Sequence, residues 1–203
     1  MRLKEEYREM TIINKSKFIA CVFPCRNEEE ARSYIEKIKK EYSDATHVCT
    51  AYMVGDNNQI QRSSDNKEPA GTAGVPMLES IKKSGLDGVC ACVVRYFGGI
   101  KLGTGGLIRA YSGAVSQALI NAPKVEEKEC SVYELLYPYE LSKSLEGWLF
   151  RNTISPRFTY DEMVRCEFIM EDDSSLSTQI QDLTKGSITP TFLRKTLIIK
   201  EVD

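Results

Sequence analysis

The stretch that decides the fold is VVRYFGGIKLGTGGLIRAYSGA, at residues 93–114, which holds six glycines. The run that leads into it, GVCACVVRYF at residues 88–97, is apolar and bounded by glycine, which predicts a buried strand. Apolar residues then recur at helical spacing over residues 107–119. Thr104 stands where an N-cap would satisfy the first free amides. The sequence therefore predicts a strand, a glycine-rich loop and a helix.

This loop has the composition of an anion-binding site. Glycine permits positive φ and close approach to the main chain, and a helix start offers unpaired N–H groups with a partial positive charge. Arg95, Lys101 and Arg109 could add donors. Alternatively, the glycines only allow close packing of the strand on the helix, and the cations face water. The P-loop lysine and the third glycine of a dinucleotide motif are both missing, which argues against a standard ATP or NAD site.

A second glycine-rich stretch, EPAGTAG at residues 68–74, also leads into a predicted helix, at about residues 77–84. The two helix starts could face a common groove, or this one could simply be another capped turn. His47 is the only histidine, and a base paired with Cys49 is conceivable, but a structural histidine is favoured because no third group orients it. We predict no catalytic residue. The candidate anion- or nucleic-acid-binding residues are Arg95, Gly98, Gly99, Lys101, Gly103, Thr104, Gly105, Gly106, Arg109, Glu68, Gly71, Thr72 and His47.

Composition excludes several classes of protein. The formal net charge is −2, with Lys and Arg in slight excess up to residue 130 and acidic residues in excess beyond it, so a polyanion would need a local patch in the first part. Seven cysteines without an apolar signal segment favour free thiols and a cytoplasmic location. No apolar run approaches the length of a membrane span. The cysteine and histidine spacing favours neither a metal nor a cofactor.

The pattern along the chain predicts two domains of α+β class. The linker is expected at residues 121–124 (NAPK), since Pro123 should end the preceding helix. Residues 59–69 are polar and rich in turn residues, which predicts a loop. After the linker the order strand, helix, strand, strand, helix, strand is typical of a ferredoxin-like domain.

Three segments resemble the IMPACT/YigZ family: THVCTAY at 46–52, EPAGTAGVPML at 68–78 and VVRYFGGIKLGTGGLIRAYSGAV at 93–115. The resemblance implies an IMPACT-type N-terminal domain at 1–124, with the fold of domain IV of elongation factor G, and a ferredoxin-like C-terminal domain at 130–203. The family's polar loop usually reads Asp-Asp-Gly, whereas this chain has Asp65-Asn66-Lys67. That departure weakens a metal-dependent site but not an anion-binding one.

Two functions follow from the resemblance and the residues. The first is a non-enzymatic binding protein linked to the regulation of translation through RNA, the ribosome or a ribosome-associated protein; eukaryotic relatives regulate translation, but with a different partner domain. The alternative is an enzyme or sensor for a small phosphorylated or nucleotide-like ligand. A scaffold that binds an acidic peptide stays open as a third reading, and no membrane partner is expected.

Overall fold

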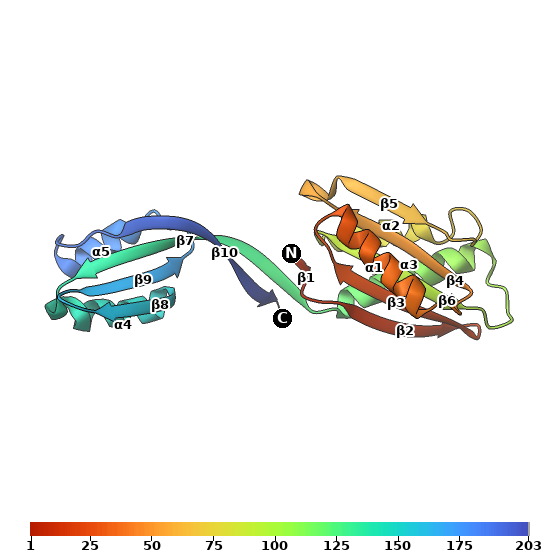
Figure 1. The fold of residues 1–203 in the computed structure, drawn as a ribbon, viewed down its shortest axis with the longest axis horizontal. Helices are drawn as coiled ribbons and strands as arrows, with labels where there is room; N and C mark the ends of the chain where they lie inside the picture. The colour runs from red at the N-terminus through yellow and green to blue at the C-terminus, as the bar shows by residue number, and fades with distance from the viewer. Residues whose placement is uncertain (203) are drawn as a thin grey trace. The chain divides into compact units, whose positions relative to one another are not determined.

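The computed structural model describes residues 1–202, and the chain divides into two compact units. Unit 1 comprises Met1–Glu126 with Glu201 and Val202, and unit 2 comprises Glu127–Lys200. Each unit contains one sheet and its own helices (Figure 1). The mixture of helices and antiparallel strands confirms the α+β class at this coarse level.

Unit 1 is built on a five-stranded antiparallel sheet in the order β2-β3-β6-β4-β5. The apolar run predicted as a strand is β6, which lies at the centre and is buried along nearly its whole length. The elements of this unit are β1 (Arg2–Leu3), β2 (Tyr7–Ile13), β3 (Ser16–Pro24), α1 (Glu28–Glu41), β4 (His47–Val54), the short 3-10 helix η1 (Asp56–Asn58), β5 (Ile60–Ser64), α2 (Gly74–Ser84), β6 (Val89–Tyr96) and α3 (Gly103–Asn121).

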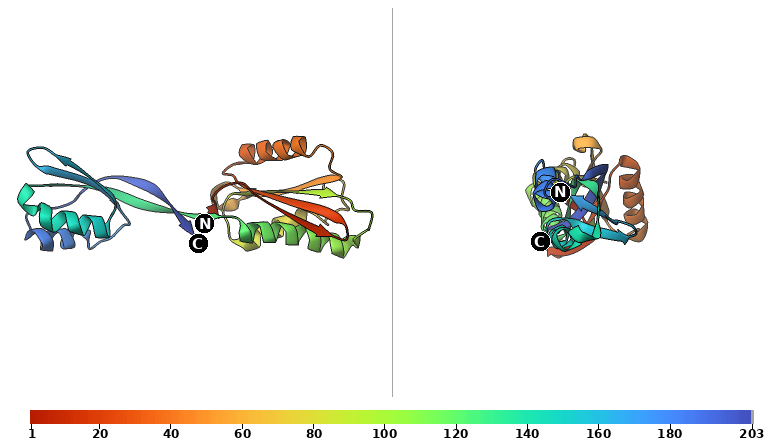
Figure 2. Two further views of the ribbon diagram at one scale, coloured as in Figure 1. Left: turned by 90° about the horizontal axis from the view of Figure 1, so that it is seen from below. Right: turned by 90° about the vertical axis from the view of Figure 1, so that its left-hand side faces the viewer.

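Helices cover both faces of this sheet. Figure 2, in its left view, shows α1 on one side and α3 on the other. Ile35 and Ile38 of α1 pack on one face, while Met77 of α2 and Tyr111 of α3 pack on the other. Each such large apolar side chain stabilises the fold by about 1.5–3 kcal/mol when fully buried. A sheet buried on both faces explains why β6 reads as a continuous apolar run rather than an alternating one.

Unit 2 has helices on one face of its sheet only. Its strands lie in the order β10-β7-β9-β8, and β1 also pairs with β7, at Lys124 and Val125. Figure 2 shows α4 and α5 on the same side of these strands. The succession of strands and helices is the one predicted from the sequence. The elements are β7 (Lys124–Tyr137), the 3-10 helix η2 (Tyr139–Leu141), α4 (Ser142–Asn152), β8 (Ile154–Tyr160), β9 (Val164–Met170), α5 (Leu176–Thr184) and β10 (Thr191–Val202).

The structure corrects two expectations about loops. The loop predicted at residues 59–69 contains β5, an edge strand whose exposed, polar side chains do not produce an apolar pattern. The linker predicted at residues 121–124 is also shorter than expected. α3 ends at Asn121 and β7 begins at Lys124, so only Ala122 and Pro123 lie between the two elements. Pro123 does follow the helix end as expected, but the chain resumes a strand directly after it.

None of the helices within residues 1–202 combines the length and apolarity that crossing a membrane requires.

Candidate functional site

The site is built on a row of side chains across three neighbouring strands. Arg95 of β6 is paired in register with Phe18 of β3 on one side and His47 of β4 on the other. Directly opposed residues project to the same face of an antiparallel sheet, so the three side chains lie together. Arg95 is only 5% exposed. Its charge therefore needs partners within the protein.

Those partners are a carboxylate, two aromatic rings and the hydroxyl of Ser16, to which Arg95 Nη2 donates at 3.5 Å. Arg95 Nη1 donates to Glu68 Oε1 at 2.6 Å, and the Tyr111 hydroxyl donates to the same oxygen at 2.7 Å. The Arg95 guanidinium also lies 5.4 Å from the ring centre of Phe18 and 5.5 Å from that of Phe97. Arg95 Nε, which is buried, has no hydrogen-bond partner. The guanidinium is thus held firmly while one of its donors stays unused.

The orientation of His47 follows from a single backbone contact. Its Nδ1 lies 3.0 Å from the carbonyl oxygen of Asn66. Because a carbonyl oxygen only accepts, Nδ1 must carry the hydrogen, which leaves Nε2 of the neutral ring as an acceptor. Nε2 lies 3.9 Å from Glu68 Oε1, and the side chain is 18% exposed. His47 therefore presents an acceptor beside Glu68.

Cys49 lies on β4 near His47 but does not form a nucleophile pair with it. The Cys49 thiol donates to the carbonyl oxygen of Asp65 at 2.9 Å and is fully buried. Burial raises the pKa of Cys49 to about 12, so the group stays a thiol at neutral pH. The structure thus supports the alternative that this cysteine packs in the core.

The start of α2 is closed by the protein's own carboxylate. Asp65 accepts hydrogen bonds from the backbone N–H groups of Gly71, Ala73 and Gly74 at 2.8, 3.0 and 2.7 Å. Partial burial acts to raise the pKa of Asp65, but these three amides outweigh it and hold the pKa below its ordinary value. The Thr72 hydroxyl donates to Pro69 O at 2.7 Å within the same turn. The amides of Gly71, Ala73 and Gly74 at this helix start are therefore occupied.

The start of α3 is not closed in this way. The helix begins at Gly103 with Leu102 as N-cap, and in the described chain no side chain caps it and no acidic residue lies in its first turn. Thr104 was predicted to be the N-cap, and this is wrong. The helix begins at Gly103, which has a φ of +69°, so Thr104 already lies in its first turn. The first amides and the positive end of the helix dipole remain available to a ligand.

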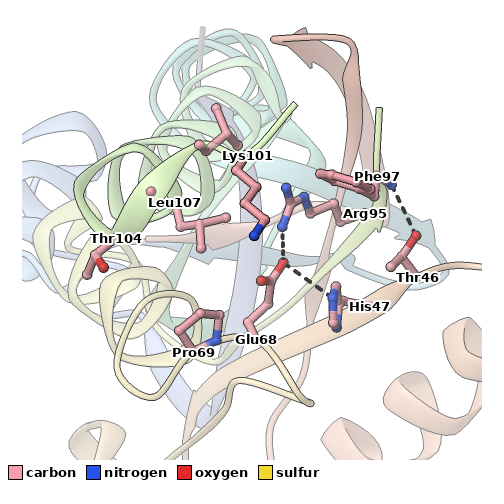
Figure 3. A pocket seen from close by; sticks show the side chains of 11 residues that line it. Thr46, His47, Glu68, Pro69, Arg95, Phe97, Lys101, Thr104 and Leu107 are labelled. Carbon is pink, nitrogen blue, oxygen red and sulfur yellow. Dashed lines mark hydrogen bonds and ion pairs between the residues drawn. The ribbon is translucent and has the colours of Figure 1, made fainter. Parts of the chain in front are cut away.

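A cavity of about 480 Å³ lies between this open helix start and the Glu68–Arg95 pair. Figure 3 shows the Lys101 side chain pointing toward the pair, with His47 beyond it. The cavity brings together six of the residues singled out in the sequence. They are His47, Glu68, Arg95, Lys101, Gly103 and Thr104.

Other predicted residues do not line this cavity. Gly71 and Thr72 belong to the turn that Asp65 closes. A Cβ on Gly98 would lie 2.0 Å from the backbone of Lys15, so Gly98 is required for close packing of two chain segments. The rest are Gly99, which turns the chain at a φ of +85°, and Gly105, Gly106 and Arg109, which lie within α3.

The other residues that line the cavity were not predicted as site residues, and most of them are apolar. Phe97 follows Arg95 by two positions on the same chain segment, and its N–H donates to Thr46 Oγ1 at 3.0 Å. Side chains two positions apart on an extended segment point to the same face, so the position of Phe97 relative to Arg95 could have identified it. The residues added by the structure are Thr46, Pro69, Phe97, Leu102 and Leu107.

Among residues 1–202, no group of three or more His, Cys, Asp or Glu side chains is placed to hold a metal ion.

Comparison with known proteins gives consistent matches. Residues 14–119 match the family described as Impact N-terminal domain. The chain is 41% identical to the IMPACT family member YvyE of Bacillus subtilis, over 91% of this chain and 86% of that protein. It is 35% identical to the IMPACT family member YigZ of Escherichia coli, over 87% and 89%. A crystal structure described as that of a hypothetical protein aligns with a TM-score of 0.57 and 31% identity, covering 95% of this chain and 96% of that one.

Proposed function

Because the chain belongs to the IMPACT family, we propose that it is a binding protein rather than an enzyme, and that it acts in the regulation of translation by contacting RNA. In this proposal the cavity at the start of α3 holds a phosphate group of the RNA. The link to translation rests on the family resemblance of the sequence, and the phosphate contact rests on the geometry of the cavity.

The open start of α3 beside Arg95 carries this proposal. A helix N-terminus favours an anion by its free amides and its dipole. Here Lys101 adds a charge. Glu68 neutralises Arg95, so the excess positive charge comes from Lys101 and the helix. The helix start and Lys101 thus meet at one cavity.

RNA binding at two salt concentrations tests the proposal. We expect a single-stranded RNA to bind at low salt and to weaken as salt is raised, because phosphate contacts release counterions. Lys101→Ala should weaken binding about fivefold or more, since the loss of one phosphate contact costs roughly 1 kcal/mol.

Lys40→Ala is the matched control, because Lys40 is an exposed cation on α1, away from the cavity. The control should leave RNA affinity unchanged. Absence of RNA binding at low salt, or equal effects of the two variants, would contradict the proposal.

A second candidate function is that of an enzyme or sensor for a small phosphorylated ligand. The observation that favours it is the size of the cavity, about 480 Å³, which lies within the range of small-molecule sites. A thermal-shift screen of phosphate compounds tests it. Stabilisation by one compound, lost in Lys101→Ala, would favour this function; no stabilisation across the screen would exclude it.

We also propose the finer fold assignments that the resemblance implies. Residues 1–124 would have the fold of domain IV of elongation factor G, and residues 130–203 would be ferredoxin-like. The strand order β10-β7-β9-β8, with both helices on one face, supports the second assignment. Comparison of each unit alone with structures of those folds tests both.

A further inference from the structure

We propose that the cavity at the start of α3 takes a ribose phosphate unit, with the sugar hydroxyls at His47 and Glu68 and the phosphate at the helix. This inference rests on the proposed function and names the chemical group recognised there. The unit could come from the 3′-terminal nucleotide of an RNA or from a free ribonucleotide, which share this chemistry because only a nucleotide with an unesterified 3′ oxygen carries both hydroxyls.

The first step is that His47 and Glu68 each offer an acceptor to the cavity. His47 donates through Nδ1 to Asn66, so its Nε2 is an acceptor. Both hydrogen bonds to the Glu68 side chain end on Oε1, and among the described residues none is made to Oε2. These two acceptors cannot bond to one another. They need donors, and a ligand that carries hydroxyl groups supplies them.

The closeness of these two residues favours neighbouring hydroxyls. His47 Nε2 lies 3.9 Å from Glu68 Oε1, the oxygen that already accepts from Arg95 and Tyr111, and is too far from it for a direct hydrogen bond. Two hydroxyls on adjacent carbons could each donate to one of the two residues. Ribose carries such a pair, and the 2′-hydroxyl distinguishes it from deoxyribose.

The opposite end of the cavity offers donors. It contains the uncapped start of α3 and the ammonium of Lys101. Figure 3 shows Lys101 on the side of the cavity opposite His47. A ligand with hydroxyls at one end and an anion at the other matches this polarity. A plain anion would leave the acceptor end unpaired.

The walls add a surface on which a base can stack. Phe97 is 47% exposed, with the Arg95 guanidinium 5.5 Å from its ring centre. Leu102, Leu107 and Pro69 complete the apolar lining. An aromatic ring beside a cationic groove is the usual arrangement for binding a nucleotide without sequence preference.

Calorimetry with a set of matched ligands tests the inference. The probes are inorganic phosphate, adenosine 5′-monophosphate and its 2′,3′-dideoxy analogue, together with a single-stranded RNA and the DNA of the same sequence. We expect the ribonucleotide to bind about tenfold more tightly than the dideoxy analogue, and RNA more tightly than DNA, because hydroxyls satisfy otherwise unpaired acceptors.

Two variants of His47 sharpen the experiment. His47→Asn keeps a donor near the Asn66 carbonyl but removes the acceptor at Nε2, and it should reduce the preference for ribose to nearly one. His47→Gln can place an acceptor near the lost Nε2 and should retain part of the preference. Lys40→Ala, which lies on α1 and does not line the cavity, should leave the preference for ribose unchanged.

The possible outcomes are distinct. Equal binding of ribose and dideoxy ligands, with phosphate binding intact, would overturn the inference but leave the proposed function standing. Failure of every phosphate-bearing probe to bind would contradict both. Binding of RNA but not of the mononucleotide would identify RNA as the source of the unit, and tight binding of the mononucleotide would identify a free nucleotide.

Discussion

The two glycine-rich helix starts of unit 1 differ in what meets their free amides. At α2 the carboxylate of Asp65 accepts three backbone hydrogen bonds. At α3 no described side chain takes that place, and a cavity lies there instead. The same backbone chemistry thus stabilises a turn at one helix and is open to a ligand at the other. Glycine content does not distinguish the two cases, whereas an internal carboxylate does.

The largest effect is expected at Glu68, which pairs with buried Arg95 and accepts from Tyr111 of α3. Removal of one partner of a buried ion pair leaves the other charge unpaired, so Glu68→Ala should lower the free energy of unfolding by about 3–5 kcal/mol. Urea denaturation measures this. Glu79→Ala is the control, because its carboxylate is exposed and pairs with Lys82 on the surface of α2. If Glu68→Ala lowers the free energy of unfolding no more than Glu79→Ala does, the Glu68–Arg95 pair does not stabilise the fold.

The next effect is expected at the closed helix start. Asp65→Ala removes the acceptor for three amides and should lower the free energy of unfolding by about 2 kcal/mol. Asp65→Asn, which keeps one oxygen acceptor, should lose less. If Asp65→Ala is as stable as the parent protein, the α2 start does not depend on its carboxylate, and the comparison fails.

The contribution of Asp65 should also depend on pH. Its pKa is lower in the folded protein than in the unfolded chain, so its stabilisation is fully present above the unfolded value of about 4. The stabilisation is lost as pH falls through the lower folded value. The difference in unfolding free energy between the parent and Asp65→Asn should therefore be constant near neutral pH and shrink below about pH 4. A difference that grows in acid would contradict this assignment.

A smaller, stabilising effect is expected in the turn that carries Asp65. Lys67 has a φ of +70°, a conformation that glycine adopts without steric cost. Lys67→Gly should raise the free energy of unfolding by roughly 0.5 kcal/mol, because relief of strain of about 1–2 kcal/mol exceeds the entropic cost of glycine. Lys83→Gly, within α2, should have the opposite sign. Destabilisation by both would show that the turn is not strained.

The smallest stability effect should come from making the α3 start resemble the α2 start. Thr104→Asp places a carboxylate in the first turn, which should stabilise the helix by about 0.5 kcal/mol. The same change should weaken phosphate binding, since the new charge competes for the helix start. Thr104→Asn is the uncharged control. Unchanged phosphate affinity in Thr104→Asp would place the ligand elsewhere.

Much of the fold of unit 1 could be predicted because its central elements carry strong patterns. β6 is an unbroken apolar run, and α1 has a local cap, Asn27, which accepts from the Glu30 amide at 2.8 Å. β5 was missed because edge strands carry polar side chains. Thr104 was misplaced because the helix already begins at Gly103, one residue earlier, with Leu102 as its N-cap.

The site could be predicted only in part, because its contacts join residues far apart in the sequence. Asp65 caps a helix that begins nine positions later, which no local capping rule detects. The pairing of Arg95 with Glu68 depends on the sheet register that sets Arg95 beside His47. The sequence supplied the cations and glycines of the cavity, but its apolar walls became recognisable only when the chain was folded.

The hydrogen bond from His47 to Asn66 has a consequence for spectroscopy. His47 is the only histidine of the chain. Its ring signals in a nuclear magnetic resonance spectrum therefore need no residue assignment, and nitrogen shifts would report directly which ring nitrogen carries the proton. A ligand that donates a hydrogen bond to Nε2 would change the chemical shift of that nitrogen and leave the shift of Nδ1 unchanged. The His47 signals would therefore report ligand binding in the cavity without an added label.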